Sequence, residues 1–129
     1  MSDTPREVAA RLLQGITDGR WSELPDLYAD DTVVEQPFSP PRPAVIRGKE
    51  EIAKHFAGSL TQQIRLRAHN VVTHETTDPE VVVVEYDYEV SAAGRTSTVH
   101  NIQVIRVRDG HIVASRDYHD HQAMLEALS

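Results

Sequence analysis

Apolar residues in the first half of the chain recur at helical spacing. Val8, Leu12 and Ile16 are four residues apart, and the segment Thr4–Glu7 before them combines a capping box with a proline at the first helical position. Such a pattern is typical of an amphipathic helix with one buried side. Two further helices are predicted in the same way: a short one after Ser22, with Leu24, Leu27 and Tyr28 as its buried face, and one over Lys49–Ala57, with Ile52 and Phe56 inside.

In the second half of the chain apolar residues recur at every second position, which is typical of strands with one solvent-exposed face. Asp109-Gly110 separates two such segments and is a strong signal for a tight hairpin. Helices followed by an antiparallel meander predict one α+β domain over residues 1–129, with the helices packed on one side of a sheet. The expected strands are Thr32–Gln36, a segment around Ile64–His69, Val81–Val90, Thr96–Arg108 and His111–His119. Pro37–Pro43 is expected to be an extended loop, and Gln122–Leu128 a brief helix or a frayed end.

The composition narrows the functional classes. The chain has 129 residues, a formal net charge of −7 and no cysteine. Scattered acidic residues argue against nucleic-acid binding, and the lack of cysteine excludes disulfides, thiolate metal sites and cysteine nucleophiles. The longest aliphatic run, Val81–Val84, is far too short to cross a bilayer, and the N-terminal segment lacks the order of a secretory signal. We therefore expect a cytoplasmic protein without nucleic-acid or membrane partners.

Several short motifs occur in the order typical of one protein family. They are Trp21-x-x-Leu24-x-x-Leu27-Tyr28-Ala29-Asp30-Asp31-x-Val33, Glu35-x-Pro37-Phe38, Gly48-Lys49-x-x-Ile52, Val107-Arg108-Asp109-Gly110-x-Ile112-Val113 and Arg116-Asp117-Tyr118-x-Asp120. Together they resemble the SnoaL-like branch of the nuclear transport factor 2-like superfamily. The resemblance implies a cone-shaped α+β barrel, in which three N-terminal helices pack on a strongly curved mixed or antiparallel sheet around a pocket. It also implies a homodimer.

Strand alternation and this resemblance together name the wall of the pocket. One face of the last strand carries Val113, Ser115, Asp117 and His119, and the other carries Ile112, Ala114, Arg116 and Tyr118. A match to ketosteroid isomerase through the final hairpin implies that the Asp117 face is the inner one. From other elements the same match brings inward Leu12, Ile16, Gln36, Phe38, Tyr86, Tyr88, Val90, Asn101 and Gln103.

Two activities of the superfamily are excluded by the residue types at the matching positions. Ketosteroid isomerase uses an Asp base with a Tyr and a protonated Asp as oxyanion hole, and the matching residues here are Gln36, Leu12 and Gln103. Gln36 cannot abstract a proton. In the Asp–Arg–Asp arrangement of limonene-epoxide hydrolase, only Asp117 matches, while Asn101 and Gln103 stand at the other two positions. The sequence thus predicts neither of these two enzymes.

Asp117 remains the candidate for acid/base chemistry, because the SnoaL-type cyclases carry such a carboxylate on the closing strand. Burial beside Tyr88 is expected to raise the pKa of Asp117 toward neutrality. His119 on the same face would share the proton, and Gln103 and Asn101 would donate hydrogen bonds to an enolate oxygen. The predicted catalytic residues are Asp117 and His119. The predicted substrate-binding residues are Gln36, Gln103, Asn101, Tyr88, Phe38, His55 and Tyr28. The pair formed by His55 and Ser59 resembles a His and Ser pair in the phenazine-biosynthesis relatives.

These assignments have structural alternatives. Asp117 would equally pair with an arginine at the pocket mouth, and His119 would lie at a frayed rim with His121. A metal on Asp117, His119 and His121 is disfavoured, because three ligands on one short strand rarely converge on an ion. Two functions follow: a cofactor-independent isomerase or polyketide-cyclase-like enzyme acting on a small hydrophobic carbonyl compound, or a non-catalytic ligand-binding or dimerisation domain of the same fold.

Overall fold

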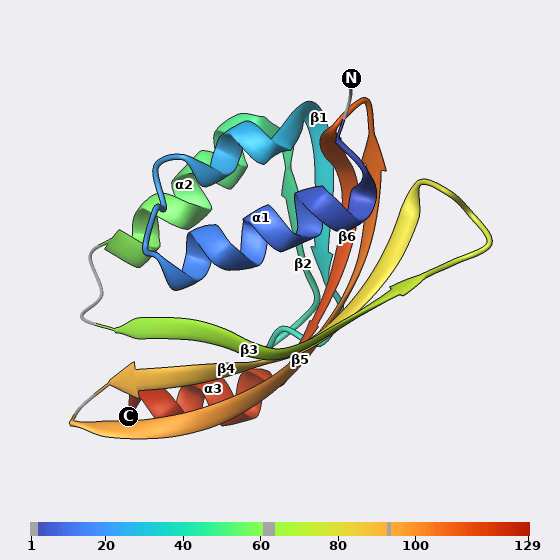
Figure 1. Cartoon of the computed structure of the whole chain (residues 1–129). Helices are drawn as coiled ribbons and strands as arrows, with labels where there is room; N and C mark the ends of the chain where they lie inside the picture. The colour runs from blue at the N-terminus through green and yellow to red at the C-terminus, as the bar shows by residue number, and fades with distance from the viewer. Residues whose placement is uncertain (1–2, 61–63, 93) are drawn as a thin grey trace.

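The computed structural model describes residues 3–60, 64–92 and 94–129. Helices α1 and α2 lie in the bend of a six-stranded sheet, and a third helix, α3, lies beside the far ends of β4 and β5 (Figure 1). In chain order the elements are α1 (Pro5–Thr17), the 3-10 turn η1 (Leu24–Leu27), β1 (Tyr28–Gln36), β2 (Ala44–Arg47), α2 (Gly48–Leu60), β3 (Arg65–Glu75), β4 (Val81–Ala92), β5 (Arg95–Arg108), β6 (His111–His119) and α3 (His121–Leu128).

The sheet has the strand order β2-β1-β6-β5-β4-β3, so the first and the last strand of the chain are neighbours. β1 and β6 run parallel, whereas every other neighbouring pair is antiparallel. The sheet bends strongly, with α1 over β3 and α2 over β1 (Figure 1). The predicted α+β class with a curved sheet is confirmed. The sheet stays open, however, because its edge strands β2 and β3 do not pair.

The first helix forms as predicted. The Thr4 side chain accepts a hydrogen bond from the Glu7 N–H, and the Glu7 side chain accepts one from the Thr4 N–H, which completes the capping box. Val8, Leu12 and Ile16 are all buried on the side that faces the sheet. Helix α1 therefore presents an aliphatic stripe to the space that the bent sheet encloses.

Two segments between the helices differ from the prediction. The short helix expected after Ser22 is only a 3-10 turn, and Tyr28 already belongs to β1, where it pairs with Ile112 of β6. Tertiary pairing thus overrides the local helical pattern at this position. Strand β2 is not predicted at all, since four residues behind a proline-rich loop are too few to show a period. It forms because the edge of β1 offers a partner for residues 44–47.

The hairpin between β5 and β6 is the one that the sequence predicts. Asp109 has φ 52° and Gly110 has φ 78°, and the type I′ turn requires positive φ at both positions. Next to the turn, Val107 pairs with Ile112, and both side chains are buried. The turn therefore sets the register at the start of β6.

A bulge at Val113 then changes which residues of β6 face inward. The register of β5 against β6 shifts by one residue here, and Ile112, Ser115 and Asp117 are all buried. This corrects the predicted alternation, which placed Ile112 on the outer face. Without the bulge, the alternation that begins at Ile112 would carry Arg116 inward and Asp117 outward.

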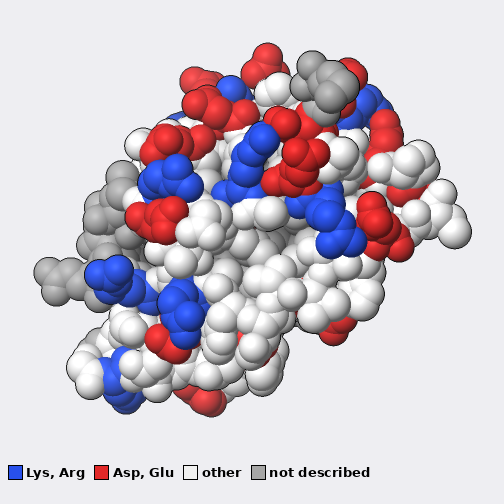
Figure 2. Space-filling view, viewed as in Figure 1, with Lys and Arg blue, Asp and Glu red and all other residues white. Residues whose placement is uncertain are grey.

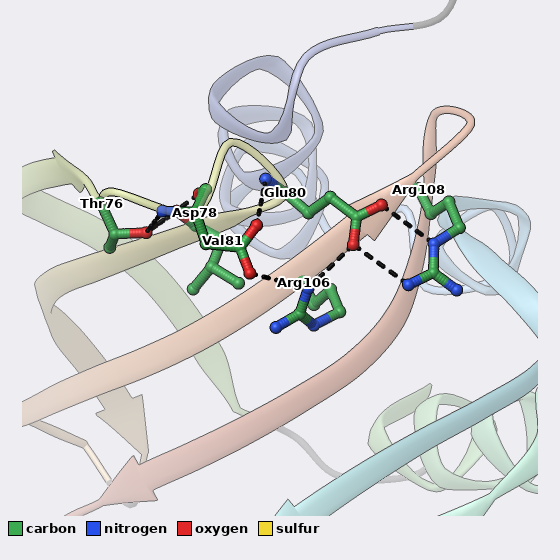
Figure 3. A network of polar contacts seen from close by, with 6 residues as sticks. All are labelled: Thr76, Asp78, Glu80, Val81, Arg106 and Arg108. Atoms are coloured by element: carbon green, nitrogen blue, oxygen red, sulfur yellow. Dashed lines mark hydrogen bonds and ion pairs between the residues drawn. The ribbon is translucent and has the colours of Figure 1, made fainter.

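The turn between β3 and β4 is held to β5 by a cluster of charges (Figure 3). Glu80 accepts hydrogen bonds from the Arg108 Nε at 2.9 Å and from the Arg106 Nη1 at 2.8 Å. These hydrogen bonds, that of Arg108 first, lower the pKa of Glu80 to about 2. Asp78 forms a second ion pair with Arg106 at 3.0 Å. Arg106 and Arg108 are therefore bound to carboxylates, outside the bend of the sheet in which α1 and α2 lie.

Charged side chains of both signs are mixed over the face seen in Figure 2, with uncharged surface between them. Within residues 3–60, 64–92 and 94–129, none of the helices has the length and apolar character that a membrane crossing requires.

Candidate functional site

A cavity of about 240 Å³ lies between the helices and the inner face of the sheet. At about 30 Å³ for one water of the liquid, it has room for about eight waters or a small organic molecule. Its walls are mostly apolar, with a polar strip along β1, β6 and β5. The apolar lining comes from Leu12, Ile16, Trp21, Val34, Ile46, Ile52, Phe56, Leu66 and Met124, and the polar lining from Tyr28, Gln36, His55, Tyr88, Gln103, Asp117, His119 and His121.

The polar strip is assembled by strand register. Gln103 of β5 pairs with Asp117 of β6, and Asn101 pairs with His119. On the other side of β6, the parallel pairing with β1 reaches Glu35 opposite Arg116, so the next residue of β1, Gln36, lies level with Asp117. Side chains from three strands thus meet at Asp117 because the strands are adjacent.

Asp117 is 7% exposed, and its hydrogen bonds to the described part of the chain involve one of its two oxygens. Its Oδ1 accepts from Gln103 Nε2 at 2.8 Å and from the Ser115 hydroxyl. Gln103 is itself held, because its Oε1 accepts from the Tyr86 hydroxyl at 2.7 Å. The other oxygen, Oδ2, lies 3.9 Å from His119 Nε2. The carboxylate is therefore oriented by buried donors while Oδ2 remains available to a ligand in the cavity.

His119 is held in one tautomer by Asn101. The His119 Nδ1 lies 2.7 Å from Asn101 Oδ1, which can only accept, so the hydrogen of the neutral ring sits on Nδ1. Asn101 Nδ2 donates to the Val99 carbonyl at 3.0 Å, and this fixes which way the amide points. Nε2 consequently carries the lone pair, and it lies 3.9 Å from Asp117 Oδ2.

Burial favours the uncharged form of two imidazoles of this site. It lowers the pKa of His119 below the usual 6.5, against the opposing effect of the Asp117 charge, and nearby His121 and His55 lower it further. Burial also lowers the pKa of His55 on α2. The ring of His121 lies 5.8 Å from that of His119, and its Nε2 is buried without a hydrogen-bond partner among the described residues. The cavity thus holds three imidazoles and one carboxylate.

Two tyrosines supply hydrogen-bond donors to the same cavity. Burial raises the pKa of Tyr88 to about 12 and that of Tyr28 well above 10, and the charge of Asp117 acts in the same direction. Both hydroxyls therefore keep their hydrogens at neutral pH. They are suited to donate to a carbonyl oxygen on a bound molecule.

Phe38 is predicted to line the cavity but lies elsewhere. Phe38 is 67% exposed and packs on Tyr118 of the outer face, with ring centroids 5.3 Å apart. Strand β1 ends at Gln36, and the chain turns there, with the Ser39 N–H bonded to the Gln36 carbonyl. Because alternation stops with the strand, the prediction that Phe38 faces the cavity is wrong.

The other predicted residues meet in one place, although two have different contacts from those expected. Asn101 does not line the cavity but bonds to His119, and Gln103 donates to Asp117 rather than standing free for an enolate. The alternative of an arginine partner for Asp117 does not apply, since its described hydrogen bonds come from Ser115 and Gln103.

Three further polar residues belong to the site besides those predicted to catalyse or to bind substrate. Ser115 and Tyr86, which are predicted to face inward, hold the Asp117 network, and His121 lines the cavity beside His119. The signal for His121 was present, because it continues the alternation of Asp117 and His119 past the end of β6. The segment is not the frayed rim given above as an alternative, because Asp120 caps α3 through the Ala123 N–H and so orders these residues.

Residues 9–115 match the sequence profile of the SnoaL-like domain. The chain belongs to the SnoaL-like family. A PhzA/B-like protein of Pseudomonas aeruginosa, itself uncharacterised, is 29% identical to it over 126 residues, which cover 95% of this chain and 89% of that protein. This SnoaL-like chain therefore has a relative that matches it over nearly the whole length.

Solved structures carry the same fold. A candidate isomerase of Bacillus subtilis superposes on this SnoaL-like protein with a TM-score of 0.86 at 25% identity, covering 95% of this chain and 90% of that one. A candidate polyketide cyclase of Pseudomonas putida superposes with a TM-score of 0.80, covering 99% and 100%, at 14% identity. The second likeness concerns the fold alone, so the function must be argued from the cavity.

The contact between Asn101 and His119 gives a direct test of the site geometry. Asn101→Leu removes the acceptor at Nδ1, and we expect the Nε2–H tautomer of His119 to gain population. Asn101→Asp keeps an acceptor there, so the Nδ1–H form should persist, with a higher His119 pKa. Two-bond 15N–1H NMR correlations of the ring report both. An unchanged tautomer in the Leu variant would contradict the positioning role of Asn101.

Proposed function

We propose that this SnoaL-like protein is a cofactor-independent isomerase or cyclase of small, apolar carbonyl compounds, which works by proton transfer. The observation that carries the proposal is the pair of proton acceptors at the cavity, Asp117 Oδ2 and His119 Nε2, 3.9 Å apart and backed by a buried hydrogen-bond network. Two acceptors on one wall, with apolar walls around them, fit general acid/base chemistry on carbon.

The proposed reaction begins with removal of a proton from the carbon beside a carbonyl group. Asp117 Oδ2 takes the proton, the C–H electron pair forms a C=C bond, and the carbonyl oxygen gains the negative charge. The Tyr88 hydroxyl, whose raised pKa keeps it protonated, would donate to that oxygen. Return of the proton to a different carbon gives an isomer. Attack of the enolate carbon on a second carbonyl of the same molecule gives a ring and an alkoxide, which takes the proton.

His119 would assist this transfer without a permanent charge. Its Nε2 carries a lone pair toward Oδ2 and can hold the proton between the two half-reactions. Asn101, Gln103 and Ser115 are positioning residues, because they touch His119 or Asp117 and hold their orientation.

A binding protein without chemistry is the second candidate. Gln36 and Gln103 line the cavity, and an amide binds a ligand through hydrogen bonds but takes up no proton near neutral pH.

The experiment that separates the two candidates measures hydrogen–deuterium exchange at the carbon beside the carbonyl group. Exchange is monitored by proton NMR in D2O for acetophenone, cyclohexanone and 2-cyclohexenone. Protein-accelerated exchange of any of them supports the enzyme. Bound ketones without acceleration favour the binding protein.

The pH dependence of this exchange follows from the site. Because burial lowers the pKa of His119 below 6.5, the ring stays a proton acceptor as the pH falls to 6.5 and is lost only under more acidic conditions. We expect the acid limb of the exchange rate to lie below pH 6.5. Asn101→Asp should shift that limb upward, since a carboxylate at Nδ1 favours the protonated ring. An acid limb that stays at the same pH in the Asn101→Asp variant would contradict the role of His119.

A further inference from the structure

We propose that the cavity takes uncharged carbonyl compounds and rejects carboxylic acids in their ionised form. The inference deepens the proposed function, on which it rests, by naming the charge of the substrate. The juxtaposition that carries it is one carboxylate, Asp117, facing a lining in which the described residues include no lysine or arginine.

The first step concerns charge inside the cavity. Asp117 is buried, and its internal partners, Gln103 and Ser115, are both neutral. Three imidazoles, those of His55, His119 and His121, are the groups of the lining that can become cationic. Burial lowers the pKa of His55 and His119, so these two do not balance a second anion near neutral pH. A ligand carboxylate would leave water for a weakly polar space that already holds a negative charge.

The second step concerns the arginines that a carboxylate ligand would need. Arg106 and Arg108 are bound to Glu80 outside the cavity (Figure 3). Arg67 is bound to Glu89 across the outer face of β3 and β4, with 2.9 Å between the charged atoms. Each of these three guanidinium groups is bound to a protein carboxylate, and none of the three lines the cavity.

The third step concerns what the lining offers instead. Tyr88 and Tyr28 provide hydroxyl donors suited to a carbonyl oxygen, and Asp117 Oδ2 with His119 Nε2 provides acceptors. A ketone whose C–H groups lie beside the carbonyl, or its enol, satisfies both kinds of group at once. A carboxylate presents only acceptors, so it meets the tyrosines but opposes Asp117.

The experiment compares acetophenone with benzoate, which have the same ring and nearly the same size but differ in charge. Dissociation constants are measured for the unmodified protein at pH 7.5 by saturation-transfer NMR titration. We expect acetophenone to bind at least about tenfold more tightly, because the repulsion from one buried carboxylate is of that order. Asp117→Asn should reduce the ratio by most of this factor. The matched variant Glu35→Gln, on the outer face of β1, should leave it unchanged.

Benzoate binding as tight as that of acetophenone, or binding of neither, would overturn the inference. Because the comparison uses the unmodified protein, it does not depend on whether the Asp117 variant folds. Binding is measured without turnover, so failure of the proposed function is seen separately. A preference for acetophenone without any isotope exchange would refute the enzyme and support the charge selection, and exchange without preference would do the reverse.

Discussion

Asp117→Asn is expected to slow isotope exchange at carbon by about 10²–10⁴-fold, the contribution that a positioned acid/base group makes to proton transfer. The substitution keeps the shape of the side chain. The new amide oxygen can still accept from Gln103 and Ser115, as Asp117 Oδ1 does. The amide nitrogen takes the place of Oδ2, 3.9 Å from His119 Nε2, so the cavity loses its carboxylate while the hydrogen bonds at the Oδ1 position are kept. Exchange is measured by proton NMR in D2O.

Two controls separate chemistry from folding for Asp117→Asn. The melting temperature should stay within a few degrees of the unmodified protein, or rise, because a buried charge has been removed. Asp31→Asn makes the same change at an exposed position of β1, and it should leave the exchange rate unaltered. If the Asp117 variant retained full exchange, Asp117 would not be the acid/base group.

Ile105→Ala is expected to lower the free energy of unfolding by about 2–5 kcal/mol, the usual cost of truncating a buried isoleucine. Ile105 is 1% exposed and lies on the inner face of β5. Ile102, on the same strand but on the outer face, is 42% exposed, so Ile102→Ala should cost less than about 1 kcal/mol. Urea unfolding measures both. Equal costs would contradict the assignment of the two faces.

The same pair of variants examines the homodimer that we propose from the family resemblance. Ile102 and Phe38 are large apolar side chains exposed on the outer side of the sheet. If a second copy covers this face, the cost of Ile102→Ala should grow with protein concentration, because unfolding is then linked to dissociation. A cost independent of concentration, together with a monomeric mass in solution, would refute the dimer.

Local signals in the sequence were sufficient for most of the elements. The capping box of Thr4 and Glu7 and the Asp109-Gly110 turn depend on neighbouring residues only, so they can be predicted from the sequence and are found in the structure. The long strands β4 and β5 also follow from their period of two. In contrast, η1 and the start of β1 depend on a partner strand distant in sequence, which no local pattern contains.

The candidate site was predicted in its composition but not in its bonding. Family resemblance brought Asp117 inward, whereas the strict alternation of β6 from its hairpin would have turned it outward. The bulge at Val113 explains why Asp117 nevertheless faces inward. One extra residue in a strand of nine residues cannot be recognised from the period of the sequence. The bonds of Gln103 and Asn101 follow from the shifted register, so they could not be named before it was known.

The parallel pairing of β1 with β6 has a consequence for the order in which the molecule becomes functional. Val34 pairs with Ser115, so β1 acquires this neighbour only after β6 has been synthesised. Contacts between such distant segments form slowly, because a long stretch of chain must first be ordered. A nascent chain that ends before β6 lacks Asp117 and His119 and leaves one edge of β1 unpaired. Synthesis of β6 therefore brings Asp117 and His119 to the cavity and pairs the free edge of β1, which would otherwise be open to aggregation.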